Sequence, residues 1–375
     1  MTAKTGDKNI SGDGKLAAAV ARLEAGGRIL VTRLQYLGDA VLTLPLVDAI
    51  KERFPGAEVD YLCRPPASDL LKRDPRFANV FELDPEAGFA AGVQLALRLR
   101  ARGYAAVIDL YSNPRSAWLA RLSGAGVRIG SDRRGRRRLY THPVSVPGDV
   151  RSAIAHHLAH GELLGVATEE RRPVLTLDPD EVELARGLLD AVGVETRRPD
   201  SPRIGIHPGG KWEVKRWPVS SFAGLVSLLR DQWDGKVVVF TGPGEEEITE
   251  QLRQAVGDGA VFIPALPVRA VAAVMSLLDG VVVSDGGIMH ISVAVGTPTV
   301  GIFGSAEPDI WFPYEPFGPF APAVVPMECR PCHKHVCPLG HTDCLNRITP
   351  DMVAETLREI MSGRRPVRAP EETSG

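Results

Sequence analysis

The chain has 375 residues, more than a single hydrophobic core usually organises, so two domains are expected. Its 44 Lys and Arg residues nearly balance its 46 Asp and Glu residues, which argues against the strong positive field of a nucleic-acid-binding protein. No apolar run approaches the roughly 18 residues that a membrane-spanning helix needs.

The chain begins with a polar stretch. Residues Met1–Lys15 are rich in Gly, Lys and Asp and lack the apolar core of a secretory signal. We therefore expect a flexible N-terminal tail over residues 1–27 of a cytoplasmic protein.

Strand-like apolar runs then alternate with amphipathic helical stretches, which is the pattern of parallel α/β sheets with crossover helices. The strands are nearly continuously apolar, as is typical of strands that are covered on both faces. A helix is predicted over Ala40–Phe54. The strands predicted in this first series are Arg28–Arg33, Glu58–Cys63, Val80–Leu83 and Ala105–Leu110.

A second series begins after Arg197–Pro202, where prolines, charges and a serine disfavour regular structure. A last helix is predicted over Thr349–Met361. The predicted domains are therefore 28–200 and 201–348, followed by a C-terminal helix and tail over 349–375. The strands predicted in the second series are Arg203–His207, Lys236–Thr241, Ala260–Ile263, Gly280–Ser284 and Thr299–Phe303.

Four loops at strand exits carry the chemistry, because ligands of open parallel sheets bind beyond the carboxyl ends of the strands. The first loop contains Gly38 and Asp39. A carboxylate at this place can act as a general base toward a substrate hydroxyl. It can equally cap the helix that follows, and composition does not separate these two interpretations.

The second loop, HPGGKWEVKRWP, offers two glycines with the cations Lys211, Lys215 and Arg216. This combination suits an anion whose charge grows as a bond breaks, although a solvated basic turn is the alternative. The loop also completes a GxxxxGK pattern, but Trp212 stands where a P-loop needs Ser or Thr to hold magnesium. A Walker-type nucleotide hydrolase is therefore rejected.

The third loop, TGPGEEE, ends in three acids at a position from which carboxylates often bind ribose hydroxyls. Acids also favour the first turn of a helix. The loop lacks the third glycine of a dinucleotide fingerprint, which ranks an oxidoreductase of Rossmann type low.

The fourth loop follows an apolar run and reads SDGGIMH, with Asp285, Gly286, Gly287 and His290. Paired glycines let backbone amides approach an anion, and the helix that they open adds the positive end of its dipole. The alternative is a tight turn that Asp285 caps.

Together these four loops, in this order, resemble glycosyltransferase family 9, the heptosyltransferases that add heptose from ADP-heptose to the inner core of lipopolysaccharide. The resemblance covers about Arg28–Leu357. It implies a GT-B architecture, in which two Rossmann-like domains with parallel sheets face a central cleft, the first binding the acceptor and the second the nucleotide sugar. It also implies inverting transfer with no metal required.

The resemblance assigns roles to individual residues. Asp39 matches the family's proposed catalytic base, Lys215 its phosphate-binding lysine, assisted by Lys211, and Glu246 the acid that holds the ribose. Asp285, Gly287 and His290 match the phosphate and sugar loop. The family usually has threonine at the position of Gly286, so this chain lacks one hydroxyl there, which leaves the donor and acceptor open.

The implied acceptor, a Kdo-lipid A type inner core, is anionic. Arg128–Arg138 is a dense basic run that suits this acceptor or an anionic membrane surface, or forms a solvated loop. The implied location is the cytoplasm, with peripheral contact to the cytoplasmic face of the inner membrane.

Four of the five cysteines crowd into residues 329–344, which read CRPCHKHVCPLGHTDC. Cys329, Cys332, Cys337 and Cys344 have a spacing that suits a structural zinc or an iron–sulfur cluster, and a reducing compartment disfavours disulfides. Unpaired thiols or a redox-sensitive staple remain alternatives, and no catalytic role follows.

Two other functions compete with this prediction. A family 9 transferase could use another nucleotide sugar or acceptor, and a non-catalytic binding module could keep the same fold. Asp39 disfavours the second alternative. The sequence does not distinguish transfer of the first core heptose from transfer of the second.

Overall fold

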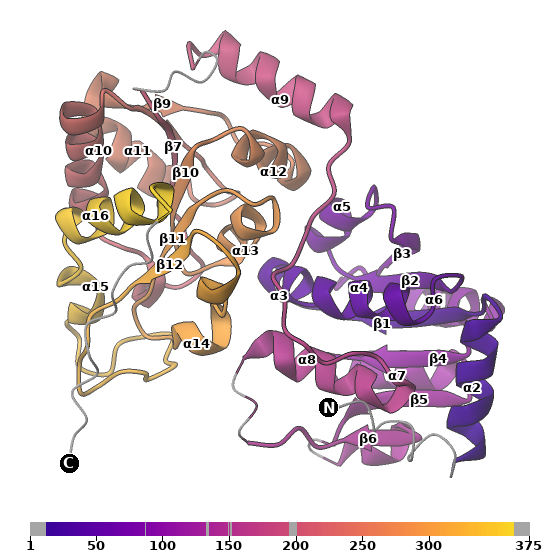
Figure 1. Cartoon of the computed structure of the whole chain (residues 1–375). Coiled ribbons are helices and arrows are strands. Elements are labelled where there is room, and N and C mark those ends of the chain that lie inside the picture. The colour runs from indigo at the N-terminus through magenta and orange to yellow at the C-terminus, as the bar shows by residue number, and fades with distance from the viewer. Residues whose placement is uncertain are drawn as a thin grey trace. The chain divides into compact units, whose positions relative to one another are not determined.

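The computed structural model describes residues 13–86, 88–132, 135–148, 150, 152–194 and 201–363. The chain divides into two compact units, Met1–Pro173 and Val174–Gly375. Each unit contains one parallel six-stranded sheet, so the predicted α/β class with two parallel sheets is confirmed. Figure 1 shows the strands and helices of both units.

The first sheet has the strand order β3-β2-β1-β4-β5-β6. Its strands are β1 Arg28–Thr32, β2 Glu58–Cys63, β3 Phe77–Glu82, β4 Ala106–Asp109, β5 Val127–Ser131 and β6 His142–Val144. The helices of this unit are α2 Gly14–Glu24, α3 Leu37–Leu42, α4 Leu44–Arg53, α5 Ala67–Leu71, α6 Phe89–Ala101, α7 Pro114–Leu122 and α8 Ala153–Gly161.

The second sheet has the order β12-β11-β10-β7-β8-β9, which repeats the order of the first sheet when it is read from the other end. Its strands are β7 Arg203–His207, β8 Lys236–Val239, β9 Val261–Phe262, β10 Gly280–Ser284, β11 Thr299–Ile302 and β12 Phe320–Ala323. The helices are α9 Pro179–Ala191, α10 Val219–Trp233, α11 Glu246–Val256, α12 Val268–Ser276, α13 Gly287–Ala294, α14 Pro308–Trp311, α15 Asp343–Asn346 and α16 Pro350–Met361.

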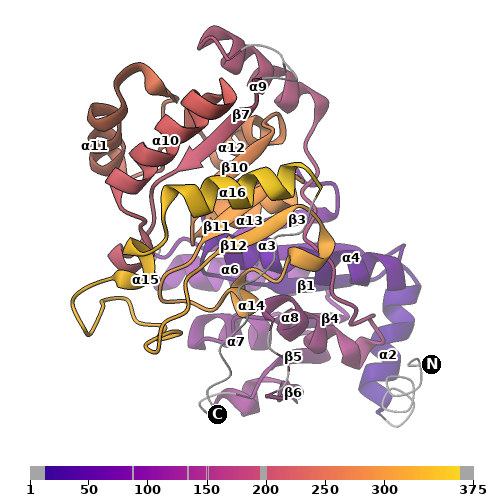
Figure 2. The same ribbon diagram turned by 60° about the vertical axis from the view of Figure 1, so that its left-hand side comes forward.

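Helices cover both faces of the second sheet, which explains why its strands are apolar throughout. Figure 1 shows α10, α11 and α16 on one side of this sheet and α12 and α13 on the other. Side chains from α10 and α16 join those of β7, β10 and β11 in one buried cluster, and Figure 2 shows α16 lying along β11 and β12. The carboxyl ends of the strands are thereby left as the edge where loops can bind a ligand.

The structure differs from the sequence prediction in three places. Residues assigned to a flexible tail form α2, because Leu16, Ala19, Val20 and Leu23 are spaced to bury one face of a helix. The predicted helix Ala40–Phe54 is two helices joined at Thr43. Strands β5, β6 and β12 were not predicted, since β5 interrupts its apolar pattern with arginine, glycine and serine, and β6 and β12 are short and contain proline.

The division between the units also differs from the predicted boundary at residue 200. The contacts divide the chain at Pro173/Val174, because α9 packs on α12. Arg269 of α12 forms an ion pair of 2.5 Å with Glu181 of α9 and donates a hydrogen bond of 2.7 Å to the carbonyl of Thr176. Of the predicted break Arg197–Pro202, residues 197–200 lie outside the described residues.

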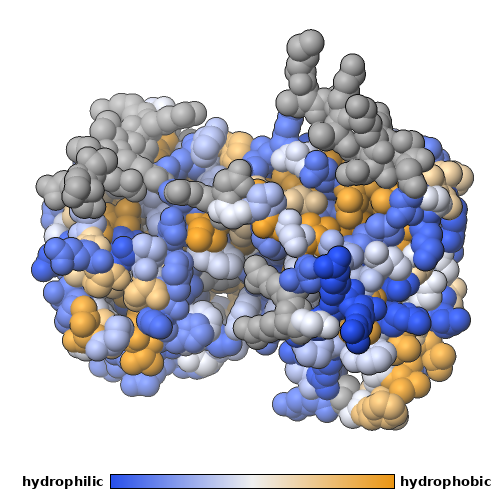
Figure 3. All heavy atoms as spheres, turned by 90° about the horizontal axis from the view of Figure 1, so that it is seen from below, coloured by the Kyte–Doolittle hydropathy of each residue, from blue (hydrophilic) through white to orange (hydrophobic). Residues whose placement is uncertain are grey.

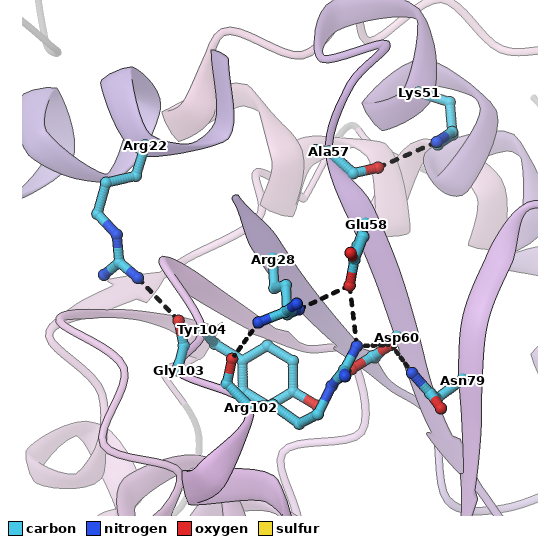
Figure 4. A network of polar contacts seen from close by, with 10 residues as sticks. All are labelled: Arg22, Arg28, Lys51, Ala57, Glu58, Asp60, Asn79, Arg102, Gly103 and Tyr104. Atoms are coloured by element: carbon cyan, nitrogen blue, oxygen red, sulfur yellow. Dashed lines mark hydrogen bonds and ion pairs between the residues drawn. The ribbon is translucent and has the colours of Figure 1, made fainter. Parts of the chain in front are cut away.

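A polar network stabilises the first sheet near the amino ends of its strands (Figure 4). Asp60 of β2 is fully buried. Its Oδ2 accepts hydrogen bonds from Arg102 Nε and from the Tyr104 hydroxyl, both at 2.8 Å. Arg102 also reaches Glu58 Oε2 at 3.0 Å. The hydrogen-bonding capacity of this buried carboxylate is therefore used by its partners, and the network stabilises the fold. The network lies at the edge of the sheet opposite the strand exits.

We expect Asp60→Ala to lower the free energy of unfolding by about 3 kcal/mol, because it leaves the Tyr104 hydroxyl and Arg102 without their buried partner. Denaturant unfolding of the variant measures this loss. Glu58→Ala is the matched control, since Glu58 is a half-exposed acid of the same network and should cost below about 1 kcal/mol. Equal losses in the two variants would contradict the prediction.

Candidate functional site

The strand order places one candidate binding point in each unit. In an open parallel sheet, ligands bind where the strand order reverses, outside the carboxyl ends of the two central strands. That point lies between β1 and β4 in the first sheet and between β7 and β10 in the second. Predicted site residues occur at both points.

In the first unit, the exits of β1 and β4 are joined by Arg33. Its Nη2 lies 2.5 Å from Asp39 Oδ2, and its Nη1 donates a hydrogen bond of 2.9 Å to the carbonyl of Leu110. Asp39 lies in the first turn of α3 and is 8% exposed. The predicted base is therefore a nearly buried carboxylate that an arginine holds in position at the strand-order reversal.

The surroundings of this pair are aromatic and neutral. The Arg33 guanidinium lies 5.2 Å from the centre of the Tyr111 ring. Behind it, buried His157 is hydrogen-bonded through Nδ1 to the carbonyl of Leu42 at 3.2 Å. Burial, with a smaller effect of the Arg33 charge, lowers the pKa of His157 well below its ordinary value. His157 is thus neutral at physiological pH and adds no positive charge beside Asp39.

The fourth and second predicted loops meet in the second unit. Lys215 Nζ lies 2.6 Å from Asp285 Oδ2, which joins the loop after β7 to the loop after β10. Burial raises the pKa of Asp285, and the Lys215 charge opposes that rise. The Lys215 side chain keeps 19% of its surface exposed. A partly exposed cation therefore stands at the strand-order reversal of the second sheet.

The two glycines next to Asp285 open helix α13. Gly286 precedes the helix in an extended conformation with φ −174°, which any residue can adopt. A Cβ at Gly286 would meet only the Ser284 carbonyl oxygen, at an ordinary contact distance of 3.8 Å. Neither backbone nor space therefore requires glycine there. The glycine therefore changes the chemistry of the loop, by removing the hydroxyl of the threonine expected at this position, and leaves its backbone unchanged. The N-terminus of α13 beside Lys215 is suited to binding an anion.

His290, another predicted site residue, lies behind this pair. It is 5% exposed, and its Nδ1 is hydrogen-bonded to the Tyr314 hydroxyl at 2.7 Å. Burial, and to a smaller extent the Lys215 charge, lowers the pKa of His290 to about 3. The imidazole is therefore neutral. Its contact with Tyr314 is an edge-on packing of two rings, with centres 5.9 Å apart.

These buried histidines predict an acid-labile fold. An unfolded histidine binds a proton near pH 6.5, whereas folded His290 binds one only near pH 3, so the free energy of unfolding falls as the pH falls between these values. The slope from one histidine is up to about 1.4 kcal/mol per pH unit. We expect His290→Asn to remove this slope in unfolding measurements made over a series of pH values. Tyr314→Phe, which keeps the histidine, should retain it, and a slope unchanged in His290→Asn would refute the assignment.

The third loop contains an acid that sequence reasoning did not select. Glu245 Oε2 lies 2.8 Å from His207 Nε2 at the end of β7 and accepts a hydrogen bond of 2.9 Å from the Gly242 amide. A Cβ at Gly209 would lie 2.0 Å from the Glu245 carboxyl carbon. Burial acts to raise the pKa of Glu245, but hydrogen bonds from His207 and the Gly242 amide, together with nearby positive charge, outweigh it and lower the pKa overall.

Glu246, the acid predicted to bind ribose, is exposed and accepts a hydrogen bond of 3.2 Å from the Gly244 amide. Its carboxylate is therefore accessible to a ligand, whereas Glu245 holds the loops after β7 and β8 together. Two features of the sequence could have drawn attention to Glu245: it follows a GxG turn, and a histidine ends the neighbouring strand. Neither feature distinguishes Glu245 from the two acids that follow it.

Trp212 connects the loop after β7 to the cysteine-rich segment. Lys211 Nζ and Lys215 Nζ each lie 5.3 Å from the centre of its ring. On the indole, the His335 ring is stacked with centres 4.0 Å apart and planes inclined by 7°. Lys211 itself is exposed. The aromatic stack thus limits the positions that the two lysines can take.

The four clustered cysteines line one pocket together with Arg330. All of them are free thiols. In the part of the chain that the structure describes, no three His, Cys, Asp or Glu side chains are grouped as metal ligands. Burial raises the pKa of the Cys344 thiol, and the Arg330 charge opposes that rise, whereas hydrogen bonds from backbone amides lower the pKa of Cys337. A structural zinc or iron–sulfur cluster at Cys329, Cys332, Cys337 and Cys344 stays a prediction.

Elemental analysis combined with thiol titration tests this metal prediction. Bound zinc or iron should appear in proportion to protein and should protect the cluster thiols from a thiol reagent until the metal is chelated. In Cys332→Ser the metal content should fall. Metal-free protein whose cluster thiols react at once would contradict the prediction. Disulfides that form on mild oxidation would favour the redox staple.

The basic run is only partly available to a ligand. Arg128 donates hydrogen bonds to the carbonyls of Leu139 at 3.0 Å and Ala125 at 2.7 Å, and burial lowers its pKa. It therefore supports the end of the sheet. Arg137 is exposed and lies 3.4 Å from Asp132. Residues 133 and 134 of the run lie outside the described residues.

Apolar and hydrophilic residues are interspersed on the face of the molecule shown in Figure 3. Within the described ranges, no helix is both long enough and apolar enough to cross a bilayer.

Comparison with known proteins places these features in context. The model of the family described as glycosyltransferase family 9 (heptosyltransferase) matches residues 93–342. Lipopolysaccharide heptosyltransferase 3 of Escherichia coli is 24% identical over 300 residues, which are 75% of this chain and 84% of that protein.

Two solved structures have the same fold. A family 9 glycosyltransferase from Veillonella parvula has a TM-score of 0.77 at 21% identity, covering 90% of this chain and 97% of that one. The E. coli ADP-heptose lipopolysaccharide heptosyltransferase II has a TM-score of 0.75 at 19% identity, covering 90% and 99%.

Proposed function

Because this chain belongs to glycosyltransferase family 9, as its sequence resemblance predicted, we propose that it transfers heptose from ADP-heptose to the inner core of lipopolysaccharide, inverting the anomeric configuration. The similar proteins support the donor and acceptor, since their names describe lipopolysaccharide heptosyltransferases and one names ADP-heptose. The observation that carries the proposal is the Lys215–Asp285 pair beside the N-terminus of α13, at the strand-order reversal of the second sheet.

In this proposal the second unit binds the donor. The ammonium of Lys215 has three N–H donors, and the 2.6 Å contact with Asp285 uses one of them, so two remain for the diphosphate. Backbone amides around Gly286 and Gly287 approach the same phosphates, and the exposed ammonium of Lys211 adds a second positive charge. Glu246, accessible on the neighbouring loop, accepts the ribose hydroxyls. His290 is neutral and supports the loop from behind.

The first unit supplies the base. Asp39 Oδ2 is held by Arg33. The carboxylate accepts the proton of the acceptor hydroxyl as that oxygen attacks the anomeric carbon, and the bond to ADP breaks on the opposite face. The acceptor oxygen forms the new glycosidic bond, and the electron pair of the broken bond leaves on the diphosphate.

No metal ion is required for departure in this mechanism. The negative charge that grows on the leaving diphosphate is offset by Lys215 and by the helix terminus, which take the role that a divalent cation has elsewhere. Full turnover in the presence of a chelator is the expected result. Loss of turnover that only magnesium restores would overturn this part of the proposal.

The acceptor of the proposed reaction is lipid-anchored, so we also propose that the enzyme works at the cytoplasmic face of the inner membrane. Arg137 and Arg138, the exposed arginines of residues 135–138, would contact its Kdo carboxylates and phosphates. A free inner-core oligosaccharide without lipid should then still be an acceptor, because these contacts involve the sugar part alone.

A direct assay tests the function. Purified protein is offered ADP-heptose, other ADP-sugars and UDP-sugars with a deep-rough lipopolysaccharide acceptor, and release of ADP or UDP is measured. We expect release of ADP from ADP-heptose alone. Turnover of another nucleotide sugar would favour the alternative family 9 transferase, which the glycine at position 286 motivates. Binding of no nucleotide sugar would refute the transferase itself.

A further inference from the structure

Helices α6 and α7 lie side by side on one face of the first sheet. Both bury residues in the same core cluster with side chains of β1, β2 and β4. The buried residues are Leu95, Ala96 and Leu99 from α6 and Ala117, Leu119 and Ala120 from α7. The opposite faces of these two helices therefore point to solvent.

Those outward faces carry large apolar side chains. On α6, Phe89 is 90% exposed, Val93 41% and Leu97 61%, and their spacing of four residues aligns them along one stripe. On α7, Trp118 is 56% exposed and Leu122 45%. We call these five residues the α6–α7 surface. Among the described residues, eleven large apolar side chains are at least 40% exposed, and five of these eleven form the α6–α7 surface.

The charges of the two helices have one sign. Neither α6 nor α7 contains Asp or Glu. Their cations, Arg98, Arg100, Arg115 and Arg121, are all exposed. The nearest acids in sequence lie outside both helices: Asp84 and Glu86 are on the loop after β3, and Asp109 is fully buried at the end of β4.

We propose that the α6–α7 surface docks the protein onto an anionic lipid bilayer. Phe, Leu and Trp side chains insert at the boundary between headgroups and acyl chains, while the long arginine side chains reach the lipid phosphates. Neither signal alone anchors a protein stably, but an apolar stripe and a cluster of cations together do. The proposal rests on the proposed function in one respect: a lipid-anchored acceptor gives the enzyme a reason to be held at a membrane.

The charge pattern favours a lipid surface over a second copy of the chain. A symmetric dimer through this face would bring the arginines of one copy toward those of the other, because a twofold interface pairs a patch with itself. No acid on either helix would offset them. A bilayer containing phosphatidylglycerol supplies the negative charge that is missing.

Vesicle sedimentation tests the proposal without any substrate. Protein is mixed with vesicles of phosphatidylethanolamine and phosphatidylglycerol, or with neutral phosphatidylcholine vesicles, at low and high salt. We expect binding to the anionic vesicles, weaker binding at high salt, and little binding to the neutral ones. The double variant Phe89→Ser, Leu97→Ser should partition at least about tenfold more weakly, since it removes two apolar anchors. Arg115→Gln with Arg121→Gln should weaken binding and reduce the salt dependence.

Leu184→Ser is the matched control, because Leu184 is a 77% exposed leucine on α9, outside the α6–α7 surface. It should bind vesicles like the wild type. Turnover of each variant on a delipidated acceptor separates the proposed function from the proposed membrane docking. The turnover should stay at the wild-type level even in variants that no longer bind vesicles. Inactivity of the wild type on that acceptor would count against the proposed function and not against docking.

Two results would overturn docking. One is wild-type binding by the Phe89→Ser, Leu97→Ser variant. The other is wild-type protein that binds no vesicles and is a dimer in light scattering, while the variant is a monomer. That result would make the surface an interface between copies of the chain.

Discussion

Lys215→Met is expected to lower kcat about a hundredfold or more. Its charge is the strongest fixed positive charge that we assign to the leaving diphosphate, and loss of one such electrostatic contact raises the barrier by about 3 kcal/mol. The affinity for ADP should fall as well. Steady-state ADP release and calorimetric ADP binding measure the two effects. Lys236→Met is the matched control, since Lys236 is an exposed lysine of the same unit at the amino end of β8, and it should leave both unchanged.

The same substitution has a structural consequence that can be separated from the catalytic one. Without Lys215, Asp285 is a buried carboxylate that has lost its ion pair. We expect the melting temperature of Lys215→Met to fall and that of the double variant Lys215→Met, Asp285→Asn to recover, while turnover stays low in both. Recovery of turnover together with stability would show that Lys215 acts only through folding.

Asp39→Asn should lower kcat about a thousandfold while ADP binding stays at the wild-type level. Asparagine keeps the shape of the side chain and an oxygen for Arg33, but it cannot take the proton of the acceptor hydroxyl, and general base catalysis is worth about a hundredfold to ten-thousandfold. Single-turnover kinetics with saturating donor give the rate of the chemical step. Binding of ADP is measured separately, because the nucleotide is assigned to the second unit.

Asp69→Asn is the control for this variant. Asp69 is an exposed acid of the same unit, paired with Lys72 at 3.0 Å, and its replacement should be silent. Full turnover by Asp39→Asn would remove Asp39 from the role of base and would make the Arg33–Asp39 pair a structural cap of α3. Partial activity restored by Asp39→Glu would support the base, since glutamate restores a carboxylate at a slightly different reach.

Local sequence was sufficient for the central strands and for the loops that leave them. The prediction of β7 and β10 agrees with the structure at both ends, because each is a run of apolar residues that ends at a polar residue or a glycine turn. The family was also predictable, since four spaced loops in a fixed order are specific where one loop is not. Short strands such as β6, with three residues, carry too little pattern to be found.

The roles of single side chains within those loops depended on contacts between distant segments. Glu245 is largely covered and Glu246 exposed because the turn after β8 aims the first of them at His207, which lies 38 positions earlier in the chain. Arg33, which no sequence signal selected, positions Asp39 because β1 and β4 are neighbours and bring Leu110 within its reach. Periodicity and composition act over a few residues and therefore determined which segments form the sheets. The pairing of strands from across each unit decided which side chains meet at their ends, and only the tertiary structure contains that information.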